Sequence, residues 1–289
     1  MNHKLYQITA SIVTYNNPIE EIEKAISSFL NTKLKVRMFI CDNSEKNELK
    51  IFHSNNIEYI KNEKNLGFGR AHNKIIDLIK DISEYHLILN PDVYFNDGVL
   101  EKLYDFMQYN KNVGLVMPKV LYPNGEIQYL CKLLPTPFYL ITRKFIPSQK
   151  ILEKINTKYE LHYKDYSQIM EVPNLSGCFM FVRTDVFNNI GKFDERFFMY
   201  MEDTDFVRRI GEKYKTIYFP EVQIYHEYKK DSYKNFKLMK YHMFSAIKYF
   251  NKWGWFFDKK RKIINKKILS DESLKNVKKE LDNKRDEIN

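Results

Sequence analysis

The chain has 289 residues, of which 44% are hydrophobic and 15% aromatic, and it carries a formal net charge of +10. This length allows one large domain or a domain with an extension, and this composition excludes an intrinsically disordered chain. Cys41, Cys131 and Cys178 form no CxxC pair and no run of about 18 apolar residues occurs, so we expect a reducing compartment, no zinc site, no secretion and no membrane span.

The N-terminal half predicts strands that alternate with helices. Ile8–Tyr15 is a run rich in β-branched residues, and Pro18 then opens a helical pattern of apolar residues that continues through Phe29. Val36–Cys41 and Ile57–Ile60 are two further apolar strands. Such alternation predicts an α/β fold with a Rossmann-like, mostly parallel sheet that is covered by helices on both faces.

Polar side chains follow the carboxyl ends of these strands, where parallel α/β sheets bind ligands. They are Thr14, Tyr15 and Asn16 after the first strand, Asp42 after the second and Asn65 after the third. The two acceptor oxygens of Asp42 suit a base or ribose edge, although an aspartate here can also be a simple turn former. Gly67 and Gly69 lead into the next helix and allow a ligand close to the backbone, but their spacing does not fit the nicotinamide-binding pattern GxGxxG.

The fourth predicted strand, Tyr85–Leu89, runs directly into Asn90, Pro91 and Asp92. Pro91 ends the strand and fixes the turn, which leaves Asp92 projecting beyond the strand edge. A hard divalent cation with bound phosphates needs only one or two protein carboxylates. Asp92 is therefore a candidate ligand of such a cation.

The middle of the chain contains both regular and irregular stretches. We predict a helix at Asp97–Tyr109, a strand at Val113–Met117 and a hairpin over Val120–Leu130. Lys132–Met170 has irregular polarity, which predicts a loop with a short helix. Since loops commonly carry specificity, we expect this one to lie over the active site. Ser176–Val182 then predicts a buried strand.

An acidic pair, Glu202 and Asp203, opens the helix predicted at Glu202–Lys213 and follows an aromatic-rich stretch. A helix N-terminus carries partial positive charge from its unpaired N–H groups, which keeps acidic side chains ionised and rigidly placed. A carboxylate held in this way can act as a general base, or it can simply cap the helix. Two short strands predicted around Pro220 then lead to His226, which could ligate a metal, donate to a phosphate or be structural.

The excess positive charge is confined to the C-terminal part of the chain. Residues 229 to 269 hold 13 Lys or Arg against two Asp, a local net charge of +11. Apolar residues from Phe236 to Phe250 recur at helical spacing, which predicts a basic amphipathic helix, and Trp253–Phe257 and the basic cluster Lys259–Lys262 follow it. This mixture favours an anionic membrane surface or a partner over nucleic acid, whereas the helix alone could also dock on the core. Ser270–Asn289 predicts a charged tail.

The order of these motifs resembles the family 2 glycosyltransferases with the GT-A fold, in particular the rhamnosyltransferase-like branch of bacterial surface polysaccharide synthesis. The resemblance spans residues 8 to 250. It rests on Ser11–Asn16, Asp42-Asn43-Ser44, Asn65-Leu66-Gly67, Asn90-Pro91-Asp92, Gly191–Asp203 and His226. With the charge pattern above, we predict a catalytic domain over residues 1–228, a basic helical extension over 229–269 and a tail over 270–289.

The resemblance also implies a role for each matching residue. The residues implied to hold the nucleotide sugar are Thr14, Tyr15, Asn16, Asp42, Asn65, Gly67, Asn90 and Asp92. Asp92 matches the last aspartate of the family's metal-binding DxD and would hold Mn²⁺ or Mg²⁺ on the donor diphosphate, with His226 close to the metal and the leaving group. Asp203 matches the general base, and Glu202 becomes an orienting or acceptor-binding neighbour. Because Asn90 stands where many members have the first aspartate, the site should bind metal more weakly and depend more on the diphosphate.

The implied reaction is an inverting transfer of a sugar from a nucleotide diphosphate donor to a saccharide acceptor that is lipid-linked, in cell-surface polysaccharide synthesis. L-rhamnose from dTDP-rhamnose is the first choice of donor, and a UDP-hexose is compatible with the same residues. We expect a cytoplasmic enzyme that is peripheral on the inner face of the membrane. A non-catalytic nucleotide-sugar-binding protein is disfavoured by the intact Glu202, Asp203 and Asp92. A nucleotidyltransferase would need a basic, glycine-rich pyrophosphate loop, and Thr14–Pro18 contains neither Gly nor Lys.

Overall fold

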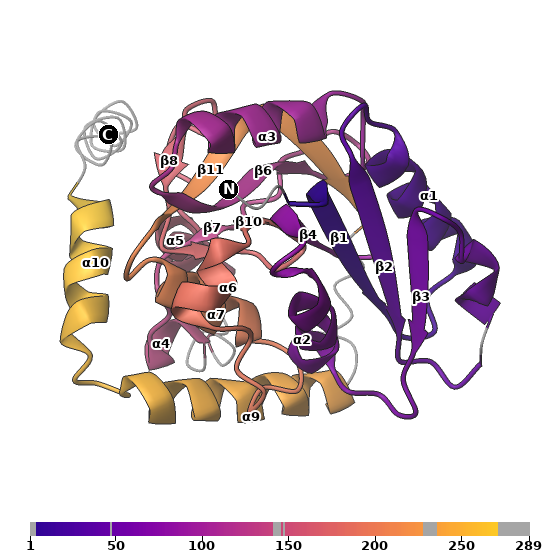
Figure 1. The fold of residues 1–289 in the computed structure, drawn as a ribbon. Coiled ribbons are helices and arrows are strands. Elements are labelled where there is room, and N and C mark those ends of the chain that lie inside the picture. Colours follow the sequence, from indigo (N-terminus) through magenta and orange to yellow (C-terminus); the bar gives the residue numbers. More distant parts are fainter. Residues whose placement is uncertain (1–3, 47, 141–145, 147, 228–235, 271–289) are drawn as a thin grey trace.

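A mixed sheet of nine strands forms the centre of the protein. The computed structural model describes residues 4–46, 48–140, 146, 148–227 and 236–270 (Figure 1). In spatial order the strands are β3 (Ile57–Lys61), β2 (Val36–Asp42), β1 (Tyr6–Thr14), β4 (Ser83–Leu89), β10 (Phe179–Arg183), β6 (Val113–Leu121), β11 (Lys215–His226) and β5 (Val93–Phe95), with β8 (Met170–Glu171) paired to β11. β7 (Cys131–Lys132) and β9 (Asn174–Leu175) pair in a separate small sheet.

The main sheet is mostly parallel, as predicted. β1, β2, β3, β4, β6 and β11 run in one direction, and β5, β8 and β10 run in the other. The strand β1 is fully buried on both of its faces, with Ile8, Ala10 and Ile12 on one face and Thr9 and Ser11 on the other. A strand buried on both faces is typical of a parallel sheet that is covered by helices on each side.

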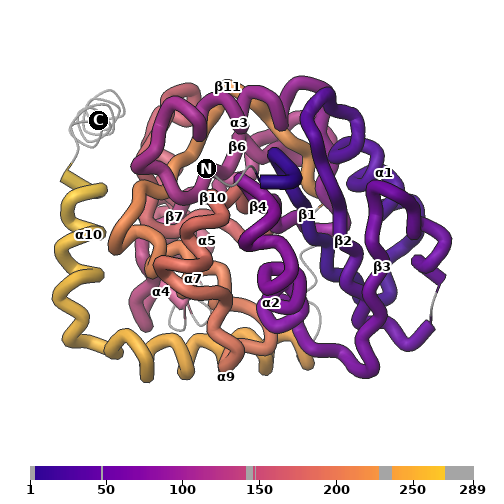
Figure 2. The backbone as a smooth tube through the Cα atoms, viewed as in Figure 1, coloured from indigo at the N-terminus to yellow at the C-terminus, as the bar shows by residue number. Residues whose placement is uncertain are grey.

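Helices connect these strands and cover the sheet. They are α1 (Ile19–Leu30), α2 (Phe68–Ile79), α3 (Val99–Tyr109), α4 (Pro137–Leu140), α5 (Gln149–Tyr159), α6 (Asp185–Ile190) and α7 (Glu202–Ile210), with a 3₁₀ turn η1 (Glu48–Phe52). Two more helices, α9 (Phe236–Trp253) and α10 (Lys259–Leu269), end the described chain. Figure 2 shows α9 running along one edge of the molecule and α10 turning away from it at the corner.

The extension is attached to the same core as the sheet. Ala246, Tyr249 and Phe250 of α9 are fully buried and belong to one cluster with the residues of the main sheet. The helix therefore docks on the core, which was one of the two alternatives for it. The tail predicted at residues 270–289 lies, apart from Ser270, outside the described residues. In the described part of the chain, no helix is long and apolar enough to cross a bilayer.

Several element boundaries differ from the predicted ones. The two strands predicted around Pro220 form the single strand β11, and the register against β6 shifts between Phe219 and Gln223, because a proline cannot donate to the ladder. The helix α7 ends at Ile210 and not at Lys213, and Gly211 follows it. The start of α3 is at Val99 because Gly98 has a left-handed φ of 81°.

Two further stretches also differ from prediction. β6 continues to Leu121, so the strand and the hairpin predicted separately over Val113–Leu130 share one strand, and a single bridge from Leu121 to Ile127 closes the turn. The predicted loop of Lys132–Met170 contains the two helices α4 and α5 in its described part. Local sequence gives little indication of these lengths, because long-range pairing decides where a strand stops.

Candidate active site

The backbone of Gly177 and Cys178, just ahead of β10, joins the two predicted acidic groups. The N–H of Asn90, at the end of β4, donates to the carbonyl of Cys178 over 2.9 Å. The N–H of Gly177 donates to Oδ2 of Asp203 over 3.0 Å. Burial, assisted by the charges of Asp92 and Asp203, raises the pKa of the Cys178 thiol to about 12. One backbone segment is therefore bonded both to the turn that carries Asp92 and to the carboxylate of Asp203, although one follows β4 and the other opens α7.

Asp203 is half-buried and firmly held at the N-terminus of α7. Its Oδ1 accepts from the N–H of Thr204 over 2.7 Å, and its Oδ2 accepts from Gly177. A Cβ atom added at Gly177 would lie 3.0 Å from Cβ and 3.2 Å from Oδ2 of Asp203. Gly177 was not among the predicted site residues, because its contact partner lies 26 positions further along the chain.

Glu202, the neighbour of Asp203, lies in a different environment. Its side chain is 5% exposed, and Oε2 has no hydrogen-bond partner among the described residues. Burial, assisted by the charge of Asp203, raises the pKa of Glu202 to about 8. Tyr200 and Met201, which precede the pair, both have a φ of 68°, a left-handed conformation that is uncommon for residues of this size. This strained turn places one carboxyl group in the interior and leaves Asp203 half-exposed.

Asp92 and His226, the two predicted metal ligands, lie together. Nε2 of His226 is 3.4 Å from Oδ1 of Asp92. Nδ1 of His226 is 3.0 Å from Oε1 of Gln128, whose side chain also donates to the His226 carbonyl over 2.8 Å. Because an amide oxygen only accepts, Nδ1 carries the proton and the lone pair of a neutral ring is on Nε2, toward Asp92. Sequence reasoning missed Gln128, which comes from the turn after β6.

This donor set fits a divalent cation. One carboxylate oxygen and one imidazole nitrogen suit Mn²⁺, and an outer hydrogen bond like that of Gln128 commonly fixes a ligating histidine. Among the residues that the structure describes, no group of three or more His, Cys, Asp or Glu could hold a metal ion. A cation here would therefore need further ligands from bound phosphates.

Asp42 lies fully buried at the end of β2 and uses its oxygens within the protein. Oδ1 accepts from the hydroxyl of Thr14 over 3.0 Å and from the N–H of Ser44 over 2.9 Å, and Oδ2 accepts from the hydroxyl of Tyr59 over 2.8 Å. Burial alone would raise the pKa of Asp42, but the hydrogen bonds from Ser44, Tyr59 and Thr14 outweigh it and lower the pKa. In this conformation Asp42 organises the strand ends and does not itself face the solvent.

More exposed groups surround Asp42. Tyr15 is 52% exposed, and Asn16 is exposed with a left-handed φ of 55° and donates its N–H to Oγ of Ser44 over 2.8 Å. The register pairs Ile12 with Leu89, so the end of β1 lies at the same edge of the sheet as the Asn90–Asp92 turn. The strand ends predicted to hold a nucleotide are therefore adjacent to the predicted metal ligands.

Asn65 and Gly67 connect this edge to the aromatic stretch Phe193–Tyr200, which lies ahead of α7. Oδ1 of Asn65 accepts from the N–H of Gly67 over 2.8 Å, and the next N–H, of Phe68, donates to the carbonyl of Phe198 over 3.1 Å. Gly67 has a φ of 79°, and a Cβ atom here would lie 2.1 Å from the Phe198 oxygen. Gly67 is thus required for close packing against the aromatic stretch, whose Phe197 is itself buried.

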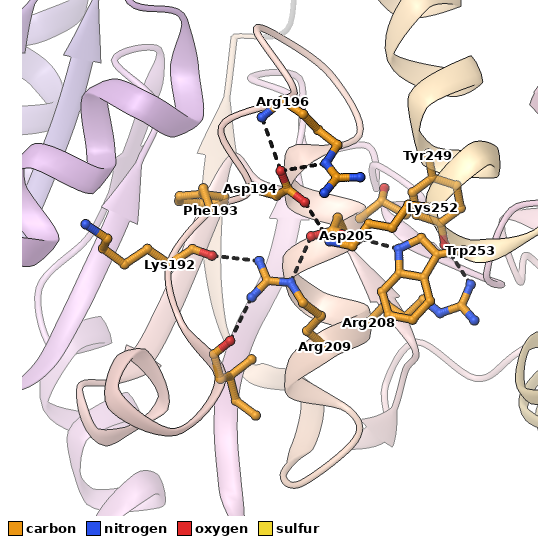
Figure 3. A network of polar contacts seen from close by, with 12 residues as sticks. Lys192, Phe193, Asp194, Arg196, Asp205, Arg208, Arg209, Tyr249, Lys252 and Trp253 are labelled. Atoms are coloured by element: carbon orange, nitrogen blue, oxygen red, sulfur yellow. Dashed lines mark hydrogen bonds and ion pairs between the residues drawn. The ribbon is translucent and has the colours of Figure 1, made fainter.

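A buried ionic network ties α7 to α9, as Figure 3 shows around Asp205. Asp205 is fully buried and accepts from Nε of Arg209 over 2.8 Å and from Nε1 of Trp253 over 2.8 Å. Nζ of Lys252 lies 2.6 Å from Asp205 and 2.7 Å from Asp194. Three segments, namely α7, the loop ahead of it and the end of α9, are therefore joined through one carboxylate.

A second buried ion pair adds α10 to this assembly. Arg208 of α7 lies 2.7 Å from Oδ2 of Asp258, the N-cap residue of α10, and stacks 3.9 Å above the ring of Trp253. On the buried side of α9, the hydroxyl of Ser245 donates to the Met199 carbonyl over 2.8 Å. The helix that carries Asp203 and the two C-terminal helices thus form one packed unit.

Comparison with known proteins shows which family this chain is similar to. The model of the family described as Glycosyl transferase family 2 matches residues 9–191. An N-acetylglucosaminyl-diphospho-decaprenol L-rhamnosyltransferase of Mycobacterium tuberculosis is 26% identical over 232 residues, which are 74% of each chain. A low-salt glycan biosynthesis hexosyltransferase, Agl10 of Haloferax volcanii, is 27% identical over 202 residues, or 69% of this chain and 60% of the relative.

Solved structures show the same fold. GalNAc-T7, crystallised with UDP, GalNAc and Mn²⁺, superimposes with a TM-score of 0.59 at 12% identity, over 78% of this chain and 43% of that one. Residues 1–349 of TarS from S. aureus give a TM-score of 0.53 at 16% identity, over 83% of this chain and 65% of that one. At these identities the likeness shows the fold alone, and it confirms the predicted GT-A architecture.

Proposed function

Because the chain belongs to glycosyltransferase family 2, we propose that it transfers a sugar from a nucleotide diphosphate to a saccharide hydroxyl with inversion at the anomeric carbon. The observation that carries this proposal is the pair of carboxylates around Cys178. Asp92 lies at the strand edge where a donor would bind, and Asp203 of α7 is linked to the same turn through the hydrogen bonds of Gly177 and Cys178. A single displacement needs a base on the face of the sugar opposite the leaving diphosphate.

Asp203 is the proposed base, and Glu202 is not. Asp203 is half-buried, so an acceptor hydroxyl can reach it, and its two backbone hydrogen bonds fix its direction. Glu202 is enclosed, and with a pKa of about 8 it is mostly protonated at neutral pH. We assign Glu202 to the support of the turn that holds Asp203. Asp42, Thr14 and Tyr15 are proposed to form the nucleotide side of the site, with Asn65, Gly67 and Asn90 adjacent.

Asp92 and His226 are proposed to hold Mn²⁺ or Mg²⁺. When bound, such a cation neutralises charge on the leaving diphosphate. Gln128 keeps the His226 ring in the orientation that this role requires, and Asn90 fixes the turn through its bond to Cys178. With one carboxylate in this set, affinity for the metal depends on the donor's phosphates.

L-rhamnose from dTDP-rhamnose is the proposed donor sugar, and a UDP-hexose is the second candidate. The first is supported by the name of the mycobacterial relative, an L-rhamnosyltransferase. The second is supported by the hexosyltransferase of Haloferax volcanii and by the UDP in the GalNAc-T7 structure. The name of the mycobacterial relative includes N-acetylglucosaminyl-diphospho-decaprenol, a saccharide on a lipid, so we propose a lipid-linked acceptor at the cytoplasmic face of a membrane.

Thermal unfolding with a panel of donors tests this proposal. A donor at 100 times its Kd stabilises the folded protein by about 2.7 kcal/mol. We expect dTDP-rhamnose to raise Tm more than UDP-glucose or UDP-galactose, and we expect Mn²⁺ to increase that shift. If every nucleotide sugar leaves Tm unchanged with and without Mn²⁺, the assignment of the site is wrong. Slow release of free sugar from the stabilising donor distinguishes an enzyme from a non-catalytic binding protein.

A further inference from the structure

The outward face of α9 combines large apolar side chains with lysines. Phe236 is 66% exposed, Phe244 61% and Ile247 38%. Lys240 lies on the same side of the helix, with its Nζ 4.7 Å from the centre of the Phe236 ring. At 100° per residue these positions fall within one narrow arc of the helix. The opposite arc contains Ser245 and Tyr249, which are buried against the rest of the protein.

Two more exposed phenylalanines lie at the corner between α9 and α10. Phe256 is 78% exposed and Phe257 is 97% exposed. Figure 1 shows this corner at the outer end of α9, at the periphery of the molecule. Exposed phenylalanines that are neighbours on one surface are unfavourable in water and mark an interaction site. We call Phe236, Lys240, Phe244, Ile247, Phe256 and Phe257 the α9 surface.

The charge that α9 and α10 themselves carry is almost entirely positive. From residue 236 to residue 269 the sequence contains a single acidic residue, Asp258. Asp258 is 8% exposed and is paired with Arg208, so it contributes little negative charge to the exterior. Lys259, Lys262 and Lys266 of α10 are exposed. A partner of this face must therefore accept both phenylalanine rings and positive charge.

We propose that the α9 surface binds an anionic lipid bilayer and holds the enzyme on the membrane. Apolar side chains that alternate with lysines on one helix face are typical of helices that lie in the interface, where the rings enter the acyl boundary and the ammonium groups meet lipid phosphates. This inference rests on the proposed function, because a lipid-linked acceptor would be presented at the same boundary.

The proposed surface is also connected to the catalytic residues. The inner side of α9 contacts the aromatic stretch through Tyr241, whose ring centre is 4.9 Å from that of Phe198, and through Ser245. Its last turn is bound to Asp205, two residues from Asp203. The α9 surface and the proposed base therefore belong to one packed unit, and contact with the bilayer fixes the height of the base above the lipids.

Vesicle flotation with the full chain tests this inference. Wild-type protein is expected to float with vesicles of phosphatidylcholine and phosphatidylglycerol, and only weakly with phosphatidylcholine alone. Phe256→Ser with Phe257→Ser, and separately Phe244→Ser with Ile247→Ser, should each lower the partition coefficient at least about tenfold. Lys240→Glu with Lys259→Glu should remove most of the dependence on phosphatidylglycerol. Matched controls are Ile51→Ser and Tyr109→Ser, which change side chains 70% and 87% exposed on η1 and at the end of α3.

The outcomes separate this inference from the proposed function. Wild-type flotation by both phenylalanine variants, or an equal loss in the controls, would overturn it. A loss in the lysine variant alone would also overturn it, because the face would then bind polyanions in general. The phenylalanine variants should retain wild-type turnover with a water-soluble saccharide acceptor, whereas Asp203→Asn should float normally and lose turnover. Turnover without any flotation refutes the membrane site and leaves the transferase intact.

Discussion

At the scale of single residues, the site depends on small side chains as much as on acids. Gly177 has no ligating group, yet its N–H holds Asp203 and its missing Cβ leaves room for that carboxylate. Glu202 and Asp203 are adjacent in sequence, but one is enclosed and the other half-exposed. Two carboxyl groups with such different surroundings can take different protonation states at one pH.

Replacing Gly177 with alanine should impair catalysis more than binding. The new Cβ would lie 3.0 Å from Cβ of Asp203, so the carboxylate must move by a few tenths of an ångström. We expect kcat to fall at least about tenfold, because a misplaced base loses its reach to the acceptor hydroxyl, with an unchanged Kd for the donor. Gly211→Ala is the matched control, since its nearest neighbour would be 3.5 Å away. Equal activity of the two variants would contradict the role of Gly177.

Glu202→Gln should change how stability depends on pH. Glu202 has a raised pKa of about 8 in the folded protein against an ordinary value of 4.5 for a glutamate in water, so the folded state binds more protons between these values. Its contribution to the free energy of unfolding therefore falls as pH rises through this window, by about 1.4 kcal/mol per pH unit. Glutamine does not titrate, so Glu202→Gln removes this pH-dependent decrease in the free energy of unfolding. The difference in Tm between Glu202→Gln and wild type should increase from pH 5 to pH 8.5, and parallel curves would contradict the burial of a protonated Glu202.

At the scale of elements, α7 is the part on which the site and the extension meet. Its first turn carries the acidic pair, and its Asp205 and Arg208 bind residues of α9 and α10. An unpaired buried charge is costly, so each member of this network depends on the others. The packing of α9 is thereby linked to the position of Asp203.

Trp253→Phe should reveal the strength of that link. The change retains an aromatic ring but removes the N–H that donates to Asp205 over 2.8 Å. Loss of a partner for a buried carboxylate costs about 1–3 kcal/mol, or a decrease in Tm of roughly 2–9 °C in a chain of this size. Trp255→Phe is the control, because the Trp255 N–H donates to the side chain of exposed Asn251. A Tm that decreases equally in both variants would show that the network contributes nothing specific.

Much of the fold was predictable from local patterns, and long-range pairings were not. Continuous apolar runs predicted β1, β2 and β4, and apolar periodicity predicted α1 and α9. The sequence around Pro220 suggested a break, yet β11 continues because β6 lies beside it over most of its length. In the same way, Asp92 was a candidate from its strand end, whereas Gln128 and Gly177 have no local signature and gain their roles from partners far along the chain.

At the scale of the whole molecule, the basic extension is part of the folded unit. Its charge suggested a segment separate from the catalytic domain, but three side chains of α9 are in the common core, and Arg208 and Arg261 are buried around Asp258. Some of the positive charge thus stabilises the interior, and the remainder surrounds the α9 surface. One rigid body can then hold a donor site, a base and a face for a membrane.

Deleting residues 236–289 should therefore destabilise the catalytic part. The truncation exposes the partners of Ala246, Tyr249 and Phe250 and leaves Asp205 and Arg208 without Trp253 and Asp258. We expect a broadened thermal transition and a loss of donor binding. Removing only residues 271–289 is the matched control. A shortened chain that unfolds at the wild-type temperature and binds donor normally would show that the extension is a separable domain.

The most direct test of the proposed mechanism is the turnover of Asp203→Asn. Asparagine keeps the size of the side chain and an acceptor oxygen for one of the two backbone N–H groups, those of Gly177 and Thr204, so the fold and the nucleotide edge should be preserved. With the donor and acceptor identified by thermal shift, we expect kcat to fall at least about 100-fold while the Kd for the donor stays within about twofold of wild type. A kcat equal to that of the wild-type enzyme would contradict the assignment of Asp203 as the base.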